Sequence, residues 1–158
     1  DTNNGRKGIQ FLIDSPKIKN YTVLMAGKEN GPLKQHPNII QLGMLNHSQL
    51  NLAYSAADLF VTPAIEEAFG QTTVEALYSG TPVVSFATAG ALQIVKNKTN
   101  GIIAKNISSD SLYEAIEEGL SLSFNPESIS NTAKKTYNPE IISNQFLDFY
   151  KTILKNAK

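Results

Sequence analysis

The chain has 158 residues, of which 41% are hydrophobic, so it is long enough to form one domain with its own core. Its 14 basic and 14 acidic residues balance, and this composition gives no reason to expect a nucleic-acid partner. The absence of cysteine excludes disulfides and thiolate metal sites, and no apolar run approaches the roughly 20 residues that span a bilayer.

Short strands and helices alternate along the chain. We expect strands where brief apolar runs rich in β-branched or aromatic side chains lie between turn residues, and helices where apolar residues recur three and four positions apart. Ser48 is the expected N-cap of the helix over 46–57, and Asp110 or Ser111 that of the helix over 111–120. The expected strands are residues 21–26, 38–43, 59–62, 83–86 and 101–104. The expected helices outside the central segment are residues 8–14, 46–57, 91–95, 111–120, 126–137 and 139–154.

This alternation predicts an α/β fold: a single Rossmann-like domain with a mainly parallel sheet of four to five strands, flanked by helices. The last expected helix carries an apolar stripe with several aromatic side chains. We expect this stripe to pack in the core or against another domain. Its members are Ile142, Phe146, Phe149, Tyr150 and Ile153.

The central segment, residues 58–90, predicts a strand, a loop, a helix, a turn and a second strand. Val74, Leu77 and Tyr78 give the helix one apolar face, and Gly80 can adopt the left-handed conformation that ends it. Both strands are apolar, which is typical of strands buried on both faces of a parallel sheet. The loop before the helix therefore lies at the carboxyl end of a strand, where open α/β sheets bind ligands.

That loop combines an open helix start with two carboxylates. Gly70 would let a ligand approach the backbone closely, and the free N–H groups of the first helical turn favour an anion. Glu67 precedes the helix and Glu75 lies inside it, with seven residues between them. A glutamate near a helix start is also common for structural reasons, because it complements the helix dipole. The two carboxylates alone therefore leave a purely structural role open.

The pattern E-x-F-G-x-x-x-x-E, set before A-L-x-x-G-T-P-V-V, resembles the donor-sugar signature of retaining glycosyltransferases of the GT-B fold, in family 4. The resemblance covers residues 6–104. It implies that residues 1–158 are the C-terminal, nucleotide-sugar-binding domain, one half of a GT-B fold, without the N-terminal acceptor domain and without the first strand of their own domain. The matching residues are Glu67, Phe69, Gly70, Glu75, Gly80, Thr81 and Pro82, preceded by Tyr54, Ala57 and Asp58.

The resemblance implies hexosyl transfer from a nucleotide-diphosphate sugar, with retention at the anomeric carbon. Glu67 and Lys7 would be catalytic, because Glu67 would orient the sugar hydroxyls and Lys7 would stabilise charge on the leaving diphosphate. Glu75 would accept hydrogen bonds from the ribose hydroxyls. The implied donor-binding residues are Arg6, Phe69, Gly70, Gln71, Thr72 and Glu75.

The resemblance implies no metal and no cofactor beyond the donor substrate, and the sequence contains no D-x-D triplet. His36 and His47 lack the spacing of metal ligands. The class of GT-B enzymes uses basic side chains and helix starts in place of a metal.

The implied partners are the nucleotide-sugar donor, the missing N-terminal domain of the same chain, and a glycan or lipid-linked acceptor of polysaccharide assembly. No nucleic-acid partner is expected. A cytoplasmic location, or a peripheral one at the inner face of the membrane, follows from the same analogy. On its own the chain should bind the donor weakly and transfer nothing. Two other interpretations stay open: a non-catalytic α/β module that binds a partner protein, and a nucleotide-sugar epimerase of the same fold.

Overall fold

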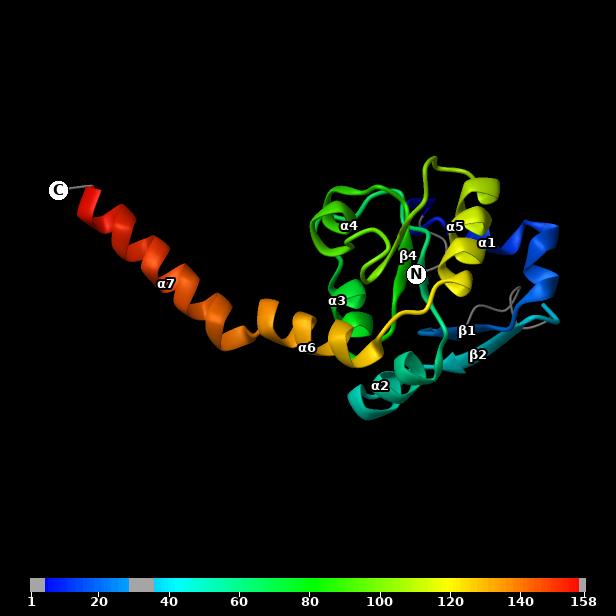
Figure 1. The fold of residues 1–158 in the computed structure, drawn as a ribbon, viewed down its shortest axis with the longest axis horizontal. Helices are drawn as coiled ribbons and strands as arrows, with labels where there is room; N and C mark the ends of the chain where they lie inside the picture. Colours follow the sequence, from blue (N-terminus) through cyan, green and yellow to red (C-terminus); the bar gives the residue numbers. More distant parts are fainter. Residues whose placement is uncertain (1–4, 29–35, 157–158) are drawn as a thin grey trace.

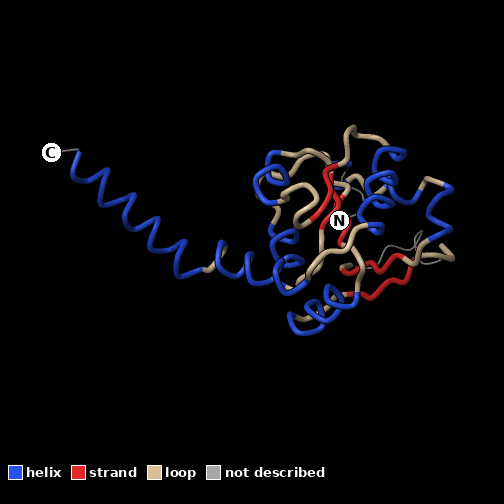
Figure 2. The backbone as a smooth tube through the Cα atoms, in the orientation of Figure 1, coloured by secondary structure: helices blue, strands red, loops and turns tan. Residues whose placement is uncertain are grey.

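The computed structural model describes residues 5–28 and 36–156 of the chain. Within them β1 pairs in parallel with β2, and β4 lies between β3 and β5, again with parallel pairing. The predicted strands are confirmed with small shifts at their ends. The described strands form two parallel sheets rather than one continuous sheet (Figure 2). Their bounds are Val23–Ala26 (β1), Ile39–Gly43 (β2), Phe60–Thr62 (β3), Val83–Ser85 (β4) and Gly101–Ile103 (β5).

From β2 onward each strand is followed by a helix, and two further helices end the described chain (Figure 1). This order confirms the predicted α/β class. The helices are Gln10–Ile13 (α1), His47–Ala56 (α2), Gln71–Tyr78 (α3), Ala89–Ile94 (α4), Ser109–Ser121 (α5), Pro126–Thr136 (α6) and Pro139–Asn156 (α7), with short 3-10 turns at Gly5–Lys7 (η1) and Pro16–Asn20 (η2).

The N-caps of two helices differ from those that the sequence predicted. The side chain of Asn46, not that of Ser48, caps α2: it accepts a hydrogen bond from the backbone N of Gln49 at 2.9 Å, and the Gln49 side chain accepts from the N of Asn46 at 3.0 Å. Ser108 caps α5 by accepting from the backbone N of Ser111 at 3.2 Å. In both helices the side chain that reaches the third helical N–H fixes the start.

Strand β4 is buried on both faces, as predicted. Val84 packs in the cluster that contains Leu112 of α5, whereas Val83 packs in the cluster that contains Leu77 of α3. Neighbouring side chains of a strand point to opposite faces, so each valine serves a different helix layer. Both are fully inaccessible to solvent. The central strand is therefore a rigid support for the loops at its carboxyl end.

Helix α7 extends away from the body of the structure (Figure 1). Within the described residues, the expectation that its apolar stripe packs in the core is wrong: Phe146, Phe149, Tyr150 and Ile153 stay 48–59% exposed. The other expectation, packing against another domain, stays a prediction. None of the described helices combines the length and the apolar character needed to cross a membrane.

Tyr113 connects α5 to α1, because its buried hydroxyl donates a hydrogen bond to the carbonyl of Leu12 at 2.7 Å. The change Tyr113→Phe leaves that carbonyl without its donor and should lower the free energy of unfolding by about 1–3 kcal/mol. Urea unfolding measures the difference. The control Tyr150→Phe alters an exposed ring on α7 and should change the same quantity by less than about 0.5 kcal/mol.

The same tyrosine should give a pH-dependent contribution to stability. Burial, with a smaller effect of Tyr21, raises the pKa of Tyr113 from 10.0 to about 12. Because the folded pKa lies above the unfolded one, the stability that this group contributes is fully present below pH 10.0 and is lost as the pH rises towards about 12. The advantage of wild type over Tyr113→Phe should shrink across that window. An advantage that stays constant there would contradict the burial of the phenol.

Candidate functional site

The loop between β3 and α3, residues 63–70, is held between two other segments of the chain. On one side the backbone N of Ile65 donates to the carbonyl of Arg6 at 2.9 Å. On the other side the backbone N of Gly90, at the start of α4, donates to the carbonyl of Glu67 at 2.9 Å. Three segments therefore meet at the carboxyl ends of β3 and β4. This is the edge at which open parallel sheets bind ligands.

Two glycines allow this close meeting. Gly8 has a φ of +60° and lies against the carbonyl of Pro63, where any Cβ would overlap that oxygen. Gly90 lies against the backbone of Phe69, so a Cβ there would overlap three of its atoms. A side chain at either position would push the loop away from its neighbour. Nothing in the sequence pattern around Gly90 indicates its contact with the loop.

Gly70 is the N-cap of helix α3; it adopts a φ of +92° and has no side chain to cap the first turn. Gly70 itself is buried. A Cβ on it would lie 3.2 Å from Oγ1 of Thr73 and 3.6 Å from Cγ of Glu67. The glycine therefore serves the left-handed backbone conformation at the start of α3, and the close approach of a ligand to its backbone stays a prediction. Gln71 and Thr72 are exposed, so they form the accessible part of the positively polarised helix start.

Lys7 and Glu67 form an ion pair beside this helix start. The Nζ of Lys7 lies 3.6 Å from Oε2 of Glu67, and the two side chains are 61% and 29% exposed. An ion pair this open to water contributes at most about 1 kcal/mol, so an incoming anion can replace the Glu67 carboxylate beside Lys7 at small cost. The two residues predicted as catalytic are thus brought together.

Glu75 is held by a hydrogen bond from α2, whereas Glu67 is held by the ion pair with Lys7. The hydroxyl of Tyr54, in α2, donates to Oε2 of Glu75 at 3.3 Å. Burial raises the pKa of Tyr54, and the neighbouring Glu75 carboxylate raises it further, so this hydroxyl keeps its proton and acts as a donor. The sequence analysis gave Tyr54 only as a residue that matches the family pattern ahead of β3. Its role as a partner of Glu75 was missed because nothing in the helix pattern shows where a tyrosine hydroxyl points.

The remaining predicted site residues also belong to this loop or its neighbour. Phe69 is 47% exposed, and its ring meets that of Tyr137, at the end of α6, edge to face with 6.3 Å between the centroids. Arg6 has an exposed side chain next to Lys7, while its carbonyl anchors Ile65. The structure thus gathers residues 6–8 and 67–72 in one place, with Glu75 further along α3 towards α2.

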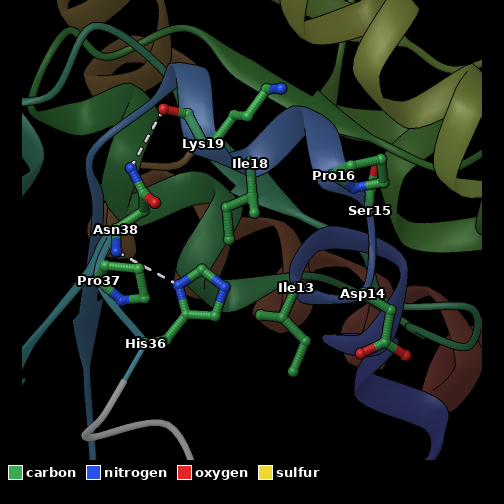
Figure 3. Close-up of a pocket in the computed structure, with 9 residues that line it drawn as sticks. All are labelled: Ile13, Asp14, Ser15, Pro16, Ile18, Lys19, His36, Pro37 and Asn38. Atoms are coloured by element: carbon green, nitrogen blue, oxygen red, sulfur yellow. Dashed lines mark hydrogen bonds between the residues drawn. The ribbon is translucent and has the colours of Figure 1, made fainter.

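Two hollows lie at the amino ends of the strands, on the side away from this loop. One, of about 390 Å³, precedes β1 and β2 (Figure 3). There the backbone N of Asn38 donates to Nδ1 of His36 at 3.3 Å, and the Asn38 side chain donates to the carbonyls of Lys19 and Tyr21. The other, of about 420 Å³, contains Asp58 and Pro82, just before β3 and β4. Nowhere among the described residues do three His, Asp or Glu side chains gather as a metal site would need.

Comparison with known proteins places the chain in a family. The family described as "Glycosyl transferases group 1" matches residues 4–136. An uncharacterized glycosyltransferase of Methanocaldococcus jannaschii is 32% identical over 145 residues, which cover 82% of this chain and 37% of that protein.

Two solved structures share the fold. A sucrose-phosphate synthase from Thermosynechococcus elongatus superposes with a TM-score of 0.80 at 22% identity, over 97% of this chain and 44% of that one. HepE of Anabaena, solved in complex with UDP-glucose, superposes with a TM-score of 0.73 at 20% identity, over 94% of this chain and 46% of that one. The chain thus spans less than half the length of these proteins. It is a domain of the group 1 glycosyl transferase family, with the α/β architecture of GT-B glycosyltransferases.

Proposed function

We propose that this chain is the donor-binding half of a retaining glycosyltransferase and that it binds a nucleotide-diphosphate sugar at the start of α3. The observation that carries the proposal is the Lys7–Glu67 ion pair, 3.6 Å long, beside the Gly70 helix start. A cation, an acid and a polarised helix end are together what a sugar diphosphate needs. The structure of HepE with UDP-glucose, which has the same fold, supports this choice of ligand.

In the proposed complex the diphosphate lies at the exposed first turn of α3. Backbone N–H groups at Gln71 and Thr72 bind its oxygens, and Lys7 exchanges the carboxylate of Glu67 for a phosphate. When the bond to the sugar breaks, negative charge grows on the diphosphate, and the lysine stabilises that charge. Arg6 adds a second positive charge next to it. These groups supply the charge that a metal ion would otherwise provide.

The two glutamates then bind the two sugars of the donor. Glu67, released from Lys7, accepts hydrogen bonds from the hydroxyls of the transferred hexose, while Glu75 accepts them from the ribose. Phe69 borders the donor with the exposed part of its ring. Retention at the anomeric carbon is part of the proposal and rests on the family resemblance of the E-x-F-G signature.

The acceptor is proposed to be a glycan or a lipid-linked glycan that a second domain presents to this one. The chain spans 37% of its relative from M. jannaschii, which leaves room in proteins of that length for such a domain. We therefore expect this chain alone to bind the donor but not to transfer the sugar. A non-catalytic interaction module would bind no nucleotide, and an epimerase would convert the donor sugar without any acceptor.

Lys7→Met should weaken binding of a nucleoside diphosphate about five- to tenfold, because it removes one charged contact to the diphosphate. Calorimetric titration of UDP, GDP and ADP measures the affinity. Lys17→Met is the matched control, because Lys17 also forms an exposed ion pair, with Asp110 at 3.8 Å, away from the loop. The control should bind as wild type does. An equal loss in both variants, or none in Lys7→Met, would remove Lys7 from the site.

Glu67→Gln should have the opposite effect on the nucleoside diphosphate. It releases Lys7 and removes a negative charge near the phosphates, so affinity should rise about two- to fivefold, the range of an exposed ion pair. The extra affinity that the sugar moiety gives the complete nucleotide sugar should fall, because its carboxylate acceptor is lost. Asp110→Asn, which frees Lys17 in the same way, should change neither value. Weaker binding of the bare diphosphate to Glu67→Gln would argue against this arrangement.

A further inference from the structure

Tyr54 of α2 joins two residues near the end of α3 through separate hydrogen bonds, one to its backbone and one from its side chain. Oγ1 of Thr81, in the turn after α3, donates to the backbone carbonyl of Tyr54 at 2.6 Å. The hydroxyl of Tyr54 then donates to Oε2 of Glu75 at 3.3 Å. The first bond is fully buried, and Thr81 is only 3% exposed. Tyr54 therefore connects a buried hydrogen bond of its backbone with a partly buried one to the carboxylate.

The tyrosine between these two hydrogen bonds has a fixed orientation. The residue is 8% exposed, and its ring packs edge to face on Phe60 of β3, with 5.3 Å between the centroids. Helix α2 is also joined to the end of α3, because Oγ of Ser79 donates to the Asn51 side chain at 2.8 Å. With ring, backbone and helix all held, the hydroxyl oxygen of Tyr54 has a fixed position next to Glu75.

Glu75 depends on that hydroxyl for its own direction. Its side chain is half-buried on α3, and a glutamate has three rotatable bonds, so a free carboxylate would adopt several orientations. The bond to Tyr54 uses Oε2 and leaves Oε1, with the remaining lone pairs of the carboxylate, for another donor. A vicinal diol offers two such donors at the right separation for one carboxylate.

We propose that Tyr54, itself held by Thr81, is a positioning residue that orients Glu75 towards the ribose diol of the donor. The inference rests on the proposed function, because it assigns the Glu75 carboxylate to the nucleotide. Tyr54 does not touch the ligand. Its hydrogen bond selects one rotamer of Glu75 before the ligand arrives, so the ligand does not have to order that side chain.

The test compares a ribonucleotide with its counterpart that lacks the diol. The affinity of the full chain is measured for whichever of UDP, GDP and ADP binds, and for the 2′,3′-dideoxy form of the same nucleotide. Tyr54→Phe keeps the ring and removes only the hydroxyl. It should weaken ribonucleotide binding about three- to tenfold and leave dideoxynucleotide binding unchanged, because only the diol contacts Glu75. Thr81→Val should give a smaller loss with the same selectivity.

Two further variants separate positioning from a structural role. Tyr78→Phe, on α3 in the same apolar cluster, should change neither affinity. In a Glu75→Gln background, Tyr54→Phe should cause no further loss, because the carboxylate that it orients is gone. Equal losses for both nucleotides in Tyr54→Phe would show a structural role and overturn the proposal.

The outcomes also separate this inference from the proposed function. If Glu75→Gln removes the preference for the ribonucleotide and Tyr54→Phe does not, the donor site stands and the positioning role is wrong. If wild type binds none of the three nucleoside diphosphates, the proposed function itself fails, and the role of Tyr54 fails with it.

Discussion

The candidate site depends on how closely the backbone of residues 63–70 approaches its two neighbours. Gly90 donates to the carbonyl of Glu67 at 2.9 Å, and Gly8 lies directly against Pro63. These contacts place the starts of α3 and α4 and the segment with Lys7 at one edge of the sheet. Because each contact passes through backbone, no side-chain adjustment can replace it. The positions of the ionisable groups follow from a backbone arrangement that two glycines allow.

Strand β4 and helix α2 hold the elements of that arrangement in place. The fully buried valines of β4 hold the sheet against α3 and α5, so the carboxyl end of the strand has a fixed position. Thr81 and Tyr54 then connect the turn after α3 to Glu75 on the same helix. The two glutamates of the signature are consequently held by different means. Glu67 is in an exposed ion pair that a ligand can exchange, while Glu75 is in a half-buried hydrogen bond that orients it.

Much of this fold could be predicted from the sequence because its signals are local. Apolar runs located each strand that the structure describes, and Gly80, which has a φ of +85°, follows the end of α3 as expected. The helix caps were missed because several polar residues precede α2 and α5, and only the backbone shows which one bonds to the third N–H. The exposed stripe of α7 has the same pattern as a buried one, so sequence could not place it. The partner of Glu75 required knowing where the hydroxyl of Tyr54 points, which depends on tertiary structure.

The central claim is that a nucleoside diphosphate binds at the exposed first turn of α3. Amide NMR of the full chain during titration with UDP, GDP and ADP tests it most directly. We expect the largest shift changes at the amides of Gln71 and Thr72, with a smaller change at Gly90, which bonds to the same loop. Two results would contradict the claim. One is shift changes confined to the hollow before β3 and β4, which contains Asp58 and Pro82. The other is no change with any of the three nucleotides.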